Sequence, residues 1–234
     1  MKINLKKGNF IPVISIISIY ILSLVLMPYL TLKLINVTSI EHRYYVLLFW
    51  QIIAITIMSI VIRNTRLNTV ENTAKRYSFL KAIGAGISFF FIMMLIQMVL
   101  SIILQILASI YGFNPISQNT QDISTAMKKA PILILYVVLF APILEELVFR
   151  KAIFGYLYDI IDTSKEWIRF ILAGILSGLA FAIPHDGISP IAVVYVVMSL
   201  VFAYLYRKTS NIVAPITAHV LMNLAVVLVQ FYLV

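Results

Sequence analysis

The chain alternates long apolar runs with short segments that are charged or rich in turn residues. Each run is continuously apolar rather than alternating, which predicts membrane-crossing helices and not the strands of a membrane barrel. A bilayer core about 30 Å thick requires roughly 20 helical residues per crossing. The predicted fold class is therefore all-α, a polytopic transmembrane helical bundle of about seven spans. These spans are Phe10–Leu34, Tyr44–Ile62, Ile83–Tyr111, Pro131–Tyr158, Ile168–His185, Pro190–Tyr206 and Ile212–Val234.

Composition supports a membrane protein and restricts the available chemistry. Of the 234 residues, 62% are hydrophobic and 12% charged, and the mean hydropathy is +1.02. Soluble domains average about 45–50% apolar and about 25% charged residues, so a water-soluble globule is excluded. The chain has no cysteine, which removes disulfides, thiolate metal ligands and a thiol nucleophile. Catalysis would have to use carboxylates, imidazoles, guanidinium groups, hydroxyls or amides.

The net charge of +9 reflects membrane topology, because cytoplasmic loops carry most lysines and arginines. The predicted spans place thirteen basic residues on one side and four on the other, with Arg150 inside a span. This bias predicts a multi-pass protein of the cell membrane with a cytoplasmic N-terminus and an external C-terminus. The partners expected are the lipid bilayer and a membrane-associated substrate; a nucleic-acid partner is not expected. The first run exceeds the 7–15 residues of a signal-peptide core, so we expect it to remain as an anchor.

Ionisable residues inside the apolar runs are the strongest functional signal, because each costs at least about 2.5–3.5 kcal/mol to insert. Glu145, Glu146 and Arg150 lie in the predicted fourth span. Glu146 and Arg150 are four residues apart, so we expect them to form an ion pair on one helix face. Glu145 points about 100° away from that pair, and its partner must come from another helix.

The fifth span ends at His185, on the same helix face as Gly174, Gly178 and Phe181. The GxxxG pair, Gly174 and Gly178, allows a neighbouring helix to approach closely. Close approach on this face would turn His185 toward the interior of the bundle.

The seventh span carries Pro215, His219 and Asn223 at intervals of four residues, and the proline is expected to bend the helix. At about 1.5 Å per residue, Glu145 and His219 lie roughly 20 Å and 10 Å from the cytosolic helix ends, while His185 falls at the far end. These depths disagree if the three residues share a site. Tilted helices, a break at Pro184 or an earlier end of the fourth span would reconcile them.

Together these side chains supply a general base, imidazoles and an amide, which suits hydrolysis of an amide bond by activated water. A covalent acyl-enzyme is disfavoured, because there is no cysteine and no G-x-S-x-G motif. Each element also has a structural interpretation, as a buried ion pair, a packing motif or a satisfied histidine. The alternative is a non-enzymatic transporter or immunity scaffold with a buried charge network, although we find no repeated halves. In the first three spans, Gln51, Gln97 and Gln105 are interpreted as helix–helix contacts without a direct role.

The motifs E-E-x-x-x-R (Glu145, Glu146, Arg150), F-x-x-x-H (Phe181, His185) and H-x-x-x-N (His219, Asn223) occur in this order on successive helices. This series resembles the CPBP family of intramembrane proteases, the CAAX protease and bacteriocin-processing (Abi) group that includes the Rce1-type prenyl-protein proteases. The resemblance covers roughly residues 131–234, a catalytic membrane core. Residues 1–130, with three predicted helices, carry no motif of the family.

The resemblance implies that Glu145 and His185 activate water, that His219 and Asn223 stabilise the oxyanion, and that Glu146 with Arg150 holds the acidic helix. It implies cleavage of a membrane-associated peptide or protein, with leader-peptide maturation or bacteriocin self-immunity as expected roles. Whether the substrates are prenylated CAAX proteins stays open.

Zinc held by Glu145, His185 and His219 is possible, since the family is often described as metalloproteases. We favour metal-free catalysis and no cofactor, because H-E-x-x-H is absent and the ligands would come from three helices. In addition, carboxylates to orient the ring nitrogens are lacking, because Glu146 is expected to be occupied by Arg150 and the only other nearby acid is Asp186.

Overall fold

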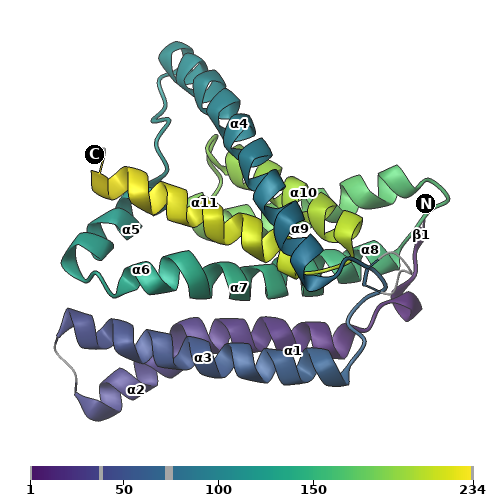
Figure 1. The fold of residues 1–234 in the computed structure, drawn as a ribbon, viewed down its shortest axis with the longest axis horizontal. Helices are drawn as coiled ribbons and strands as arrows, with labels where there is room; N and C mark the ends of the chain where they lie inside the picture. The colour runs from purple at the N-terminus through teal and green to yellow at the C-terminus, as the bar shows by residue number, and fades with distance from the viewer. Residues whose placement is uncertain (1, 37–38, 72–75, 233–234) are drawn as a thin grey trace.

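The computed structural model describes residues 2–36, 39–71 and 76–232, which form a bundle of helices (Figure 1). The elements, in chain order, are β1 (Lys2–Ile3), η1 (Leu5–Lys7), α1 (Phe10–Ile21), η2 (Leu22–Leu26), α2 (Met27–Ile35), α3 (Ile40–Asn64), α4 (Phe79–Tyr111), α5 (Gln118–Lys129), α6 (Leu133–Leu135), η3 (Tyr136–Phe140), α7 (Ala141–Glu145), η4 (Glu146–Phe154), α8 (Gly155–Ile160), β2 (Ile161–Asp162), α9 (Glu166–Asp186), α10 (Ala192–Thr209) and α11 (Val213–Tyr232).

Within the described ranges, six helices are long and apolar enough to cross a membrane, and the all-α fold class is confirmed. The predicted fourth span is not among these six. It is nevertheless helical without a break over residues 133–160, in which α-helical turns alternate with the π-helical turns η3 and η4. Its charged residues reduce its apolar character: Glu145, Glu146, Arg150, Lys151 and Asp159.

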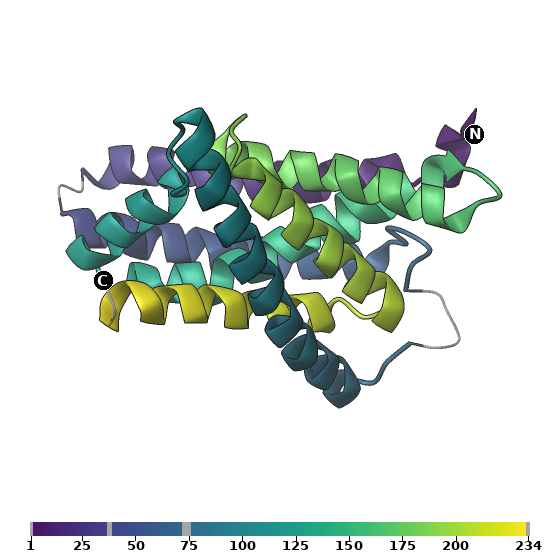
Figure 2. The ribbon, with the colours of Figure 1, turned by 90° about the horizontal axis from the view of Figure 1, so that it is seen from above.

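Most helices run along the long axis of the molecule, but α4 crosses the bundle obliquely (Figures 1 and 2). The first part of α4 packs against α11, and its second part diverges from α11 in both views. A Cβ atom at Gly86 would lie 2.6 Å from the Ala214 carbonyl oxygen and 2.6 Å from Thr217 Cβ. Glycine at this crossing therefore allows α4 and α11 to touch.

The close approach predicted for the GxxxG pair is confirmed. A Cβ atom at Gly174 would lie 2.6 Å from Leu200 of α10, and one at Gly178 would lie 3.3 Å from Val196 of α10. The packed face carries Phe181 inward. Helix α9 also continues through Pro184 to Asp186, so the break considered at this proline does not occur.

The segment from 114 to 129, which the sequence marks only as polar, contains the short helix α5. Helix α4 ends at Gly112, whose φ of +73° is readily adopted by glycine. Ser117 then caps α5 by accepting a hydrogen bond from the Thr120 backbone N–H at 3.1 Å. The helix contacts α6 and α9, and a loop separates it from the divergent end of α4 (Figure 1).

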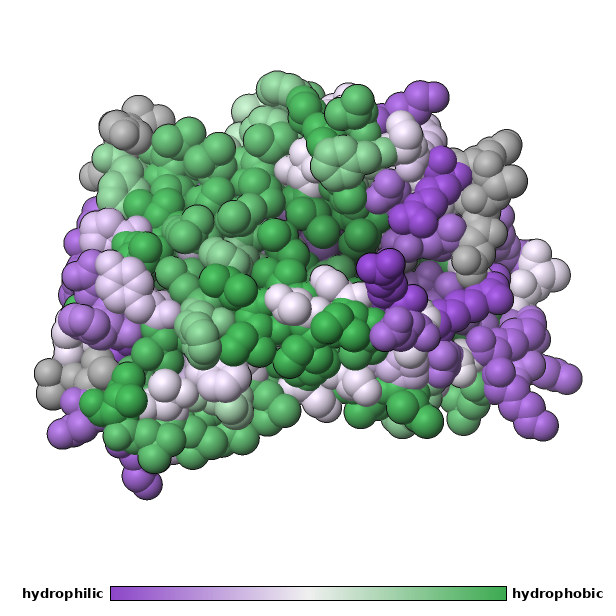
Figure 3. All heavy atoms as spheres, turned by 60° about the horizontal axis from the view of Figure 1, so that its bottom comes forward, coloured by the Kyte–Doolittle hydropathy of each residue, from purple (hydrophilic) through white to green (hydrophobic). Residues whose placement is uncertain are grey.

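Hydrophilic residues gather at the end of the molecule where β1 lies, and an apolar surface covers much of the remainder (Figure 3). At this end β1 pairs with β2, and Lys7 Nζ lies 3.0 Å from Asp162 Oδ1. The hydrogen bond and positive charge of Lys7 lower the pKa of Asp162. Apolar side chains such as Ile11 and Leu80 are more than three-quarters exposed, as expected for helices that face lipid.

Candidate active site

Three ionisable side chains from three helices meet at one point. Glu145 is the last residue of α7, His185 is near the end of α9, and His219 is in the second turn of α11. Glu145 Oε1 lies 3.9 Å from His185 Nε2, and Glu145 Oε2 lies 3.6 Å from His219 Nε2. The depths counted from the helix ends suggested a mismatch, but the count treated all helices as parallel to the membrane normal. Helix crossing brings the three residues together.

His185 is oriented by its own helix and by two aromatic rings. Its Nδ1 lies 2.6 Å from the Phe181 carbonyl oxygen, which can only accept, so Nδ1 carries the hydrogen. Its ring centroid lies 4.5 Å from that of Phe181 and 4.8 Å from that of Tyr195. In the neutral ring, the lone pair on Nε2 consequently faces Glu145.

Glu146 is buried next to Glu145, His185 and His219, and its carboxylate has two partners. Its Oε2 is 3.1 Å from Arg150 Nε, which confirms the predicted ion pair, and both side chains are completely buried. Its Oε1 is 2.8 Å from His219 Nδ1. The expectation that Arg150 would leave Glu146 unavailable to a histidine was therefore wrong, because the two carboxylate oxygens serve different partners.

Arg150 is stabilised by charge and by aromatic faces. Its guanidinium carbon lies 4.6 Å from the Phe181 ring centroid and 5.3 Å from that of Phe202. Its nitrogen atoms have no aligned hydrogen-bond acceptor among the described residues. The carboxylate charge of Glu146 and the two ring faces therefore compensate for burial of this cation.

Asn223 is anchored to the acidic helix by its side-chain amide. Its Nδ2 donates to the Val137 carbonyl oxygen at 2.8 Å. In the π-helical turn η3 the Ala141 N–H bonds to the Tyr136 carbonyl, and Pro142 has no N–H to offer Val137. Asn223 thus satisfies a carbonyl that the helix leaves free. The amide retains a second N–H, which is available to a ligand.

Pro215 has a different effect from the one expected. It lies in the first turn of α11, where backbone N–H groups have no partner within the helix. It therefore removes no hydrogen bond from the helix interior, which is the physical cause that the predicted bend before His219 would need.

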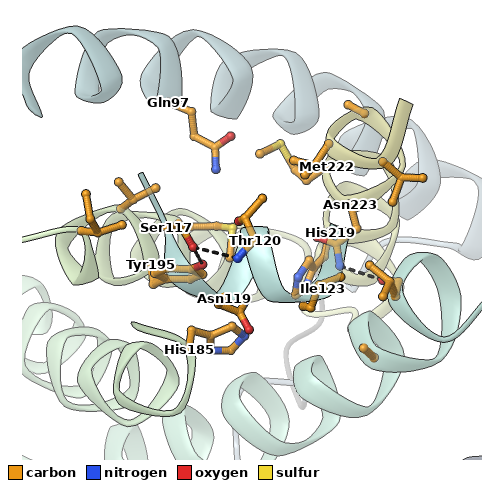
Figure 4. A pocket seen from close by; sticks show the side chains of 18 of the residues that line it. Gln97, Ser117, Asn119, Thr120, Ile123, His185, Tyr195, His219, Met222 and Asn223 are labelled. Atoms are coloured by element: carbon orange, nitrogen blue, oxygen red, sulfur yellow. Dashed lines mark hydrogen bonds between the residues drawn. The ribbon is translucent and has the colours of Figure 1, made fainter. Parts of the chain in front are cut away.

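A cavity of about 810 Å³ opens beside these residues (Figure 4). Glu145, His185, His219 and Asn223 line it, whereas Glu146 and Arg150 do not. The volume lies within the range of small-ligand and substrate sites. The predicted site residues therefore form two groups, one facing the cavity and the other supporting it from behind.

Sequence reasoning missed several residues that line the cavity. Tyr20 comes from α1, and Gln97, Ser101 and Gln105 come from α4. The interpretation of Gln97 and Gln105 as helix–helix contacts was wrong, because they face the cavity. A signal was present in the sequence, since these α4 residues recur every four positions on an otherwise apolar helix.

The metal alternative meets a geometric difficulty. Glu145 lies between the two histidines and presents a different oxygen to each, at 3.9 Å from His185 Nε2 and 3.6 Å from His219 Nε2. In the part of the chain that the structure describes, no group of three or more His, Cys, Asp or Glu side chains is placed to hold a metal ion. Catalysis without metal stays a prediction, which elemental analysis of the active protein can test.

Comparison with known proteins shows what this region is similar to. Residues 127–225 match the model of the family described as Type II CAAX prenyl endopeptidase Rce1-like. These residues form an Rce1-like segment. No solved structure matches the chain.

The chain is also similar to named proteins. The membrane-embedded CAAX protease MroQ of Staphylococcus aureus is 39% identical over 141 residues, 60% of this chain and 55% of that protein. The putative membrane peptidase YdiL of Bacillus subtilis is 38% identical over 121 residues, 52% of this chain and 46% of that protein. The chain thus spans about half the length of these two relatives. The UPF0177 protein YajF of Lactococcus lactis is 36% identical over 80 residues, 34% of this chain and 35% of that protein.

The Rce1-like segment contains all six site residues predicted from the sequence, but it does not include the whole cavity wall. Tyr20 and the polar residues of α4 precede residue 127. The cavity therefore depends on helices outside the family match.

Proposed function

We propose that this protein is an intramembrane endopeptidase, which uses water to hydrolyse a peptide bond in a membrane-associated peptide or protein. The observation that carries the proposal is the position of Glu145, between the Nε2 atoms of His185 and His219 on a cavity wall. The relatives named as a CAAX protease and a putative membrane peptidase support the same class of reaction.

Glu145 and His185 are suited to hold the attacking water. Both present acceptors when His185 is neutral, and their separation of 3.9 Å is too long for a direct hydrogen bond. A water molecule that donates one hydrogen to each would be positioned with a lone pair toward the substrate. Glu145 then takes a proton as the water oxygen attacks the carbonyl carbon.

His219 is suited to stabilise the oxyanion that this attack creates. With both ring nitrogens protonated, its Nδ1 donates to Glu146 and its Nε2 donates toward the cavity. The remaining N–H of Asn223 can supply a second donor. The proton held by Glu145 passes to the leaving nitrogen as the C–N bond breaks, which yields an amine and a carboxylic acid that then loses its proton to the amine or to water.

The experiment that tests this proposal is proteolysis by purified protein, with a substrate found by comparing membrane peptides from cells with and without the gene. Mass spectrometry should detect peptides that accumulate without the gene and are cleaved when the purified protein is added. Glu145→Gln and His185→Ala should abolish cleavage while the protein still accumulates in the membrane. Leader-peptide maturation and bacteriocin self-immunity remain predictions that the identified substrates will test.

A suitable control is Met98→Leu, since Met98 is exposed on α4 and does not line the cavity. This variant should cleave as the wild type does. Near-normal turnover by Glu145→Gln would contradict the assignment of the base. If the wild type cleaves nothing, the non-enzymatic alternative gains support.

A further inference from the structure

Helix α4 presents three polar side chains, Gln97, Ser101 and Gln105, to the cavity. The rest of the helix is mainly apolar, and neighbours such as Met98 and Ile102 are exposed on its other side. Gln97 points into the cavity from the side opposite His185 (Figure 4). The polar stripe and the Glu145 group therefore belong to different walls of one space.

The side chains of this stripe have no hydrogen-bond partner among the residues that the structure describes. Gln51 of α3 provides a direct contrast, because its Nε2 donates to the Ser23 carbonyl oxygen at 2.9 Å and ties two helices together. An amide at membrane depth without a partner is unfavourable. The stripe is consequently not explained by helix packing, and its donors and acceptors are available to a ligand.

The spacing of the stripe matches that of an extended peptide. Four helical residues rise about 6 Å, so Gln97, Ser101 and Gln105 form a row with steps of about 6 Å. Two residues of an extended strand span about 6.6–6.8 Å. A primary amide offers a donor and an acceptor, the same pair that each peptide group requires. The row can therefore meet every second residue of an extended backbone.

The surroundings of the stripe define which side chains such a peptide would carry. Met94 and Leu104 flank the polar residues on α4, and Met127, Met222 and Val226 line the cavity from α5 and α11. Methionine adapts to apolar groups of different shape. The lining therefore suits a segment with apolar side chains of varied size.

We propose that the Gln97–Ser101–Gln105 stripe binds the backbone of an extended apolar segment of the substrate and presents it to Glu145. That the bound peptide is then cleaved rests on the proposed function. That a peptide binds along this stripe does not. It assigns peptide recognition to α4, outside the Rce1-like segment. It also predicts recognition of backbone and general apolar character rather than of one side chain.

The absence of native cysteine allows a direct test, because a single introduced thiol is unique. Gln97→Cys and Gln105→Cys proteins in detergent would be labelled with a water-soluble thiol reagent, with and without short, apolar, internally quenched peptides. Bound peptide should slow labelling at both positions several-fold. Lys165→Cys, at an exposed position before α9, should label equally with and without peptide.

A second measurement uses Gln97→Met and Gln105→Met, which keep side-chain length and remove hydrogen bonding. Each should raise the KM about 5-fold to 10-fold, the loss expected for one or two hydrogen bonds, with little change in kcat. N-methylation of alternate peptide nitrogens should raise the KM of the wild type. The same methylation should raise the KM of the methionine variants by a smaller factor. A purely structural role would not produce this coupling.

The outcomes separate the two proposals. If peptide slows labelling of the introduced cysteines but is not cleaved, the stripe is supported as a binding site and the proposed function is contradicted. Cleavage by the wild type with no protection at Gln97→Cys or Gln105→Cys would overturn the inference, as would an unchanged KM in both methionine variants.

Discussion

At the residue scale, one carboxylate links the cavity to the buried core. Glu146 contacts Arg150 through one oxygen and His219 through the other. The ion pair could be predicted from sequence because its members are four residues apart on one helix. The bond to His219 joins residues 73 positions apart, and local spacing carries no information about such a contact.

Glu146→Ala should destabilise the protein by about 3–5 kcal/mol, because it leaves the charge of Arg150 buried without its counter-ion. The measurement is thermal unfolding of purified protein in detergent. Glu146→Ala combined with Arg150→Met should recover part of the lost stability, since no unpaired charge remains. A single Glu146→Ala variant as stable as the wild type would contradict the importance of the pair.

We expect activity without metal, because H-E-x-x-H is absent and Glu145, His185 and His219 come from three separate helices. Elemental analysis of extensively dialysed, active protein should find no stoichiometric zinc, and a chelator should leave turnover unchanged. Zinc at one equivalent, with activity lost to a chelator and restored by zinc alone, would refute the metal-free mechanism.

At the element scale, apolar runs were sufficient to locate the long helices, but they did not specify how the helices cross. Gly174 and Gly178 identified one close contact because the GxxxG motif is local. Gly86 marks another contact, and the sequence around it carries only the weaker small-residue spacing of Ala82 and Gly86. The four-residue spacing of Gln97, Ser101 and Gln105 places them on one face of α4, but what that face meets depends on how α4 crosses α11, which the sequence does not specify.

Gly86→Ala should lower the free energy of unfolding by about 1–3 kcal/mol, because its Cβ would meet a backbone oxygen and Thr217 Cβ of α11. Gly84→Ala is a matched control on the same helix, since a Cβ there meets nothing within 4 Å. The control should equal the wild type or exceed it by less than about 1 kcal/mol. Equal destabilisation by both variants would show that helix contact is not responsible.

At the scale of the whole molecule, β1 and the end of α11 lie at opposite ends of the bundle (Figure 1). This arrangement agrees with an odd number of crossings, provided that residues 133–160 also cross. Which end faces the cytoplasm remains a prediction from the distribution of basic residues.

Reporter fusions after Lys208 should read as cytoplasmic, and fusions at Val234 should read as external. Paired reporters that are active on opposite sides of the membrane would check both positions. A cytoplasmic reading at Val234 would mean that one of the predicted crossings does not span the membrane.

The length of α4 makes the cavity responsive to bilayer thickness. Its 33 residues extend about 50 Å, whereas the hydrocarbon core measures about 30 Å, so this helix fits only at a steep tilt. A thicker bilayer favours a more upright helix. Helix α4 is held to α11 near Gly86. A smaller tilt of α4 would therefore move its polar stripe toward α11 and narrow the cavity. We therefore expect the turnover proposed above to fall as acyl chains lengthen, so that membrane thickness itself would set the rate.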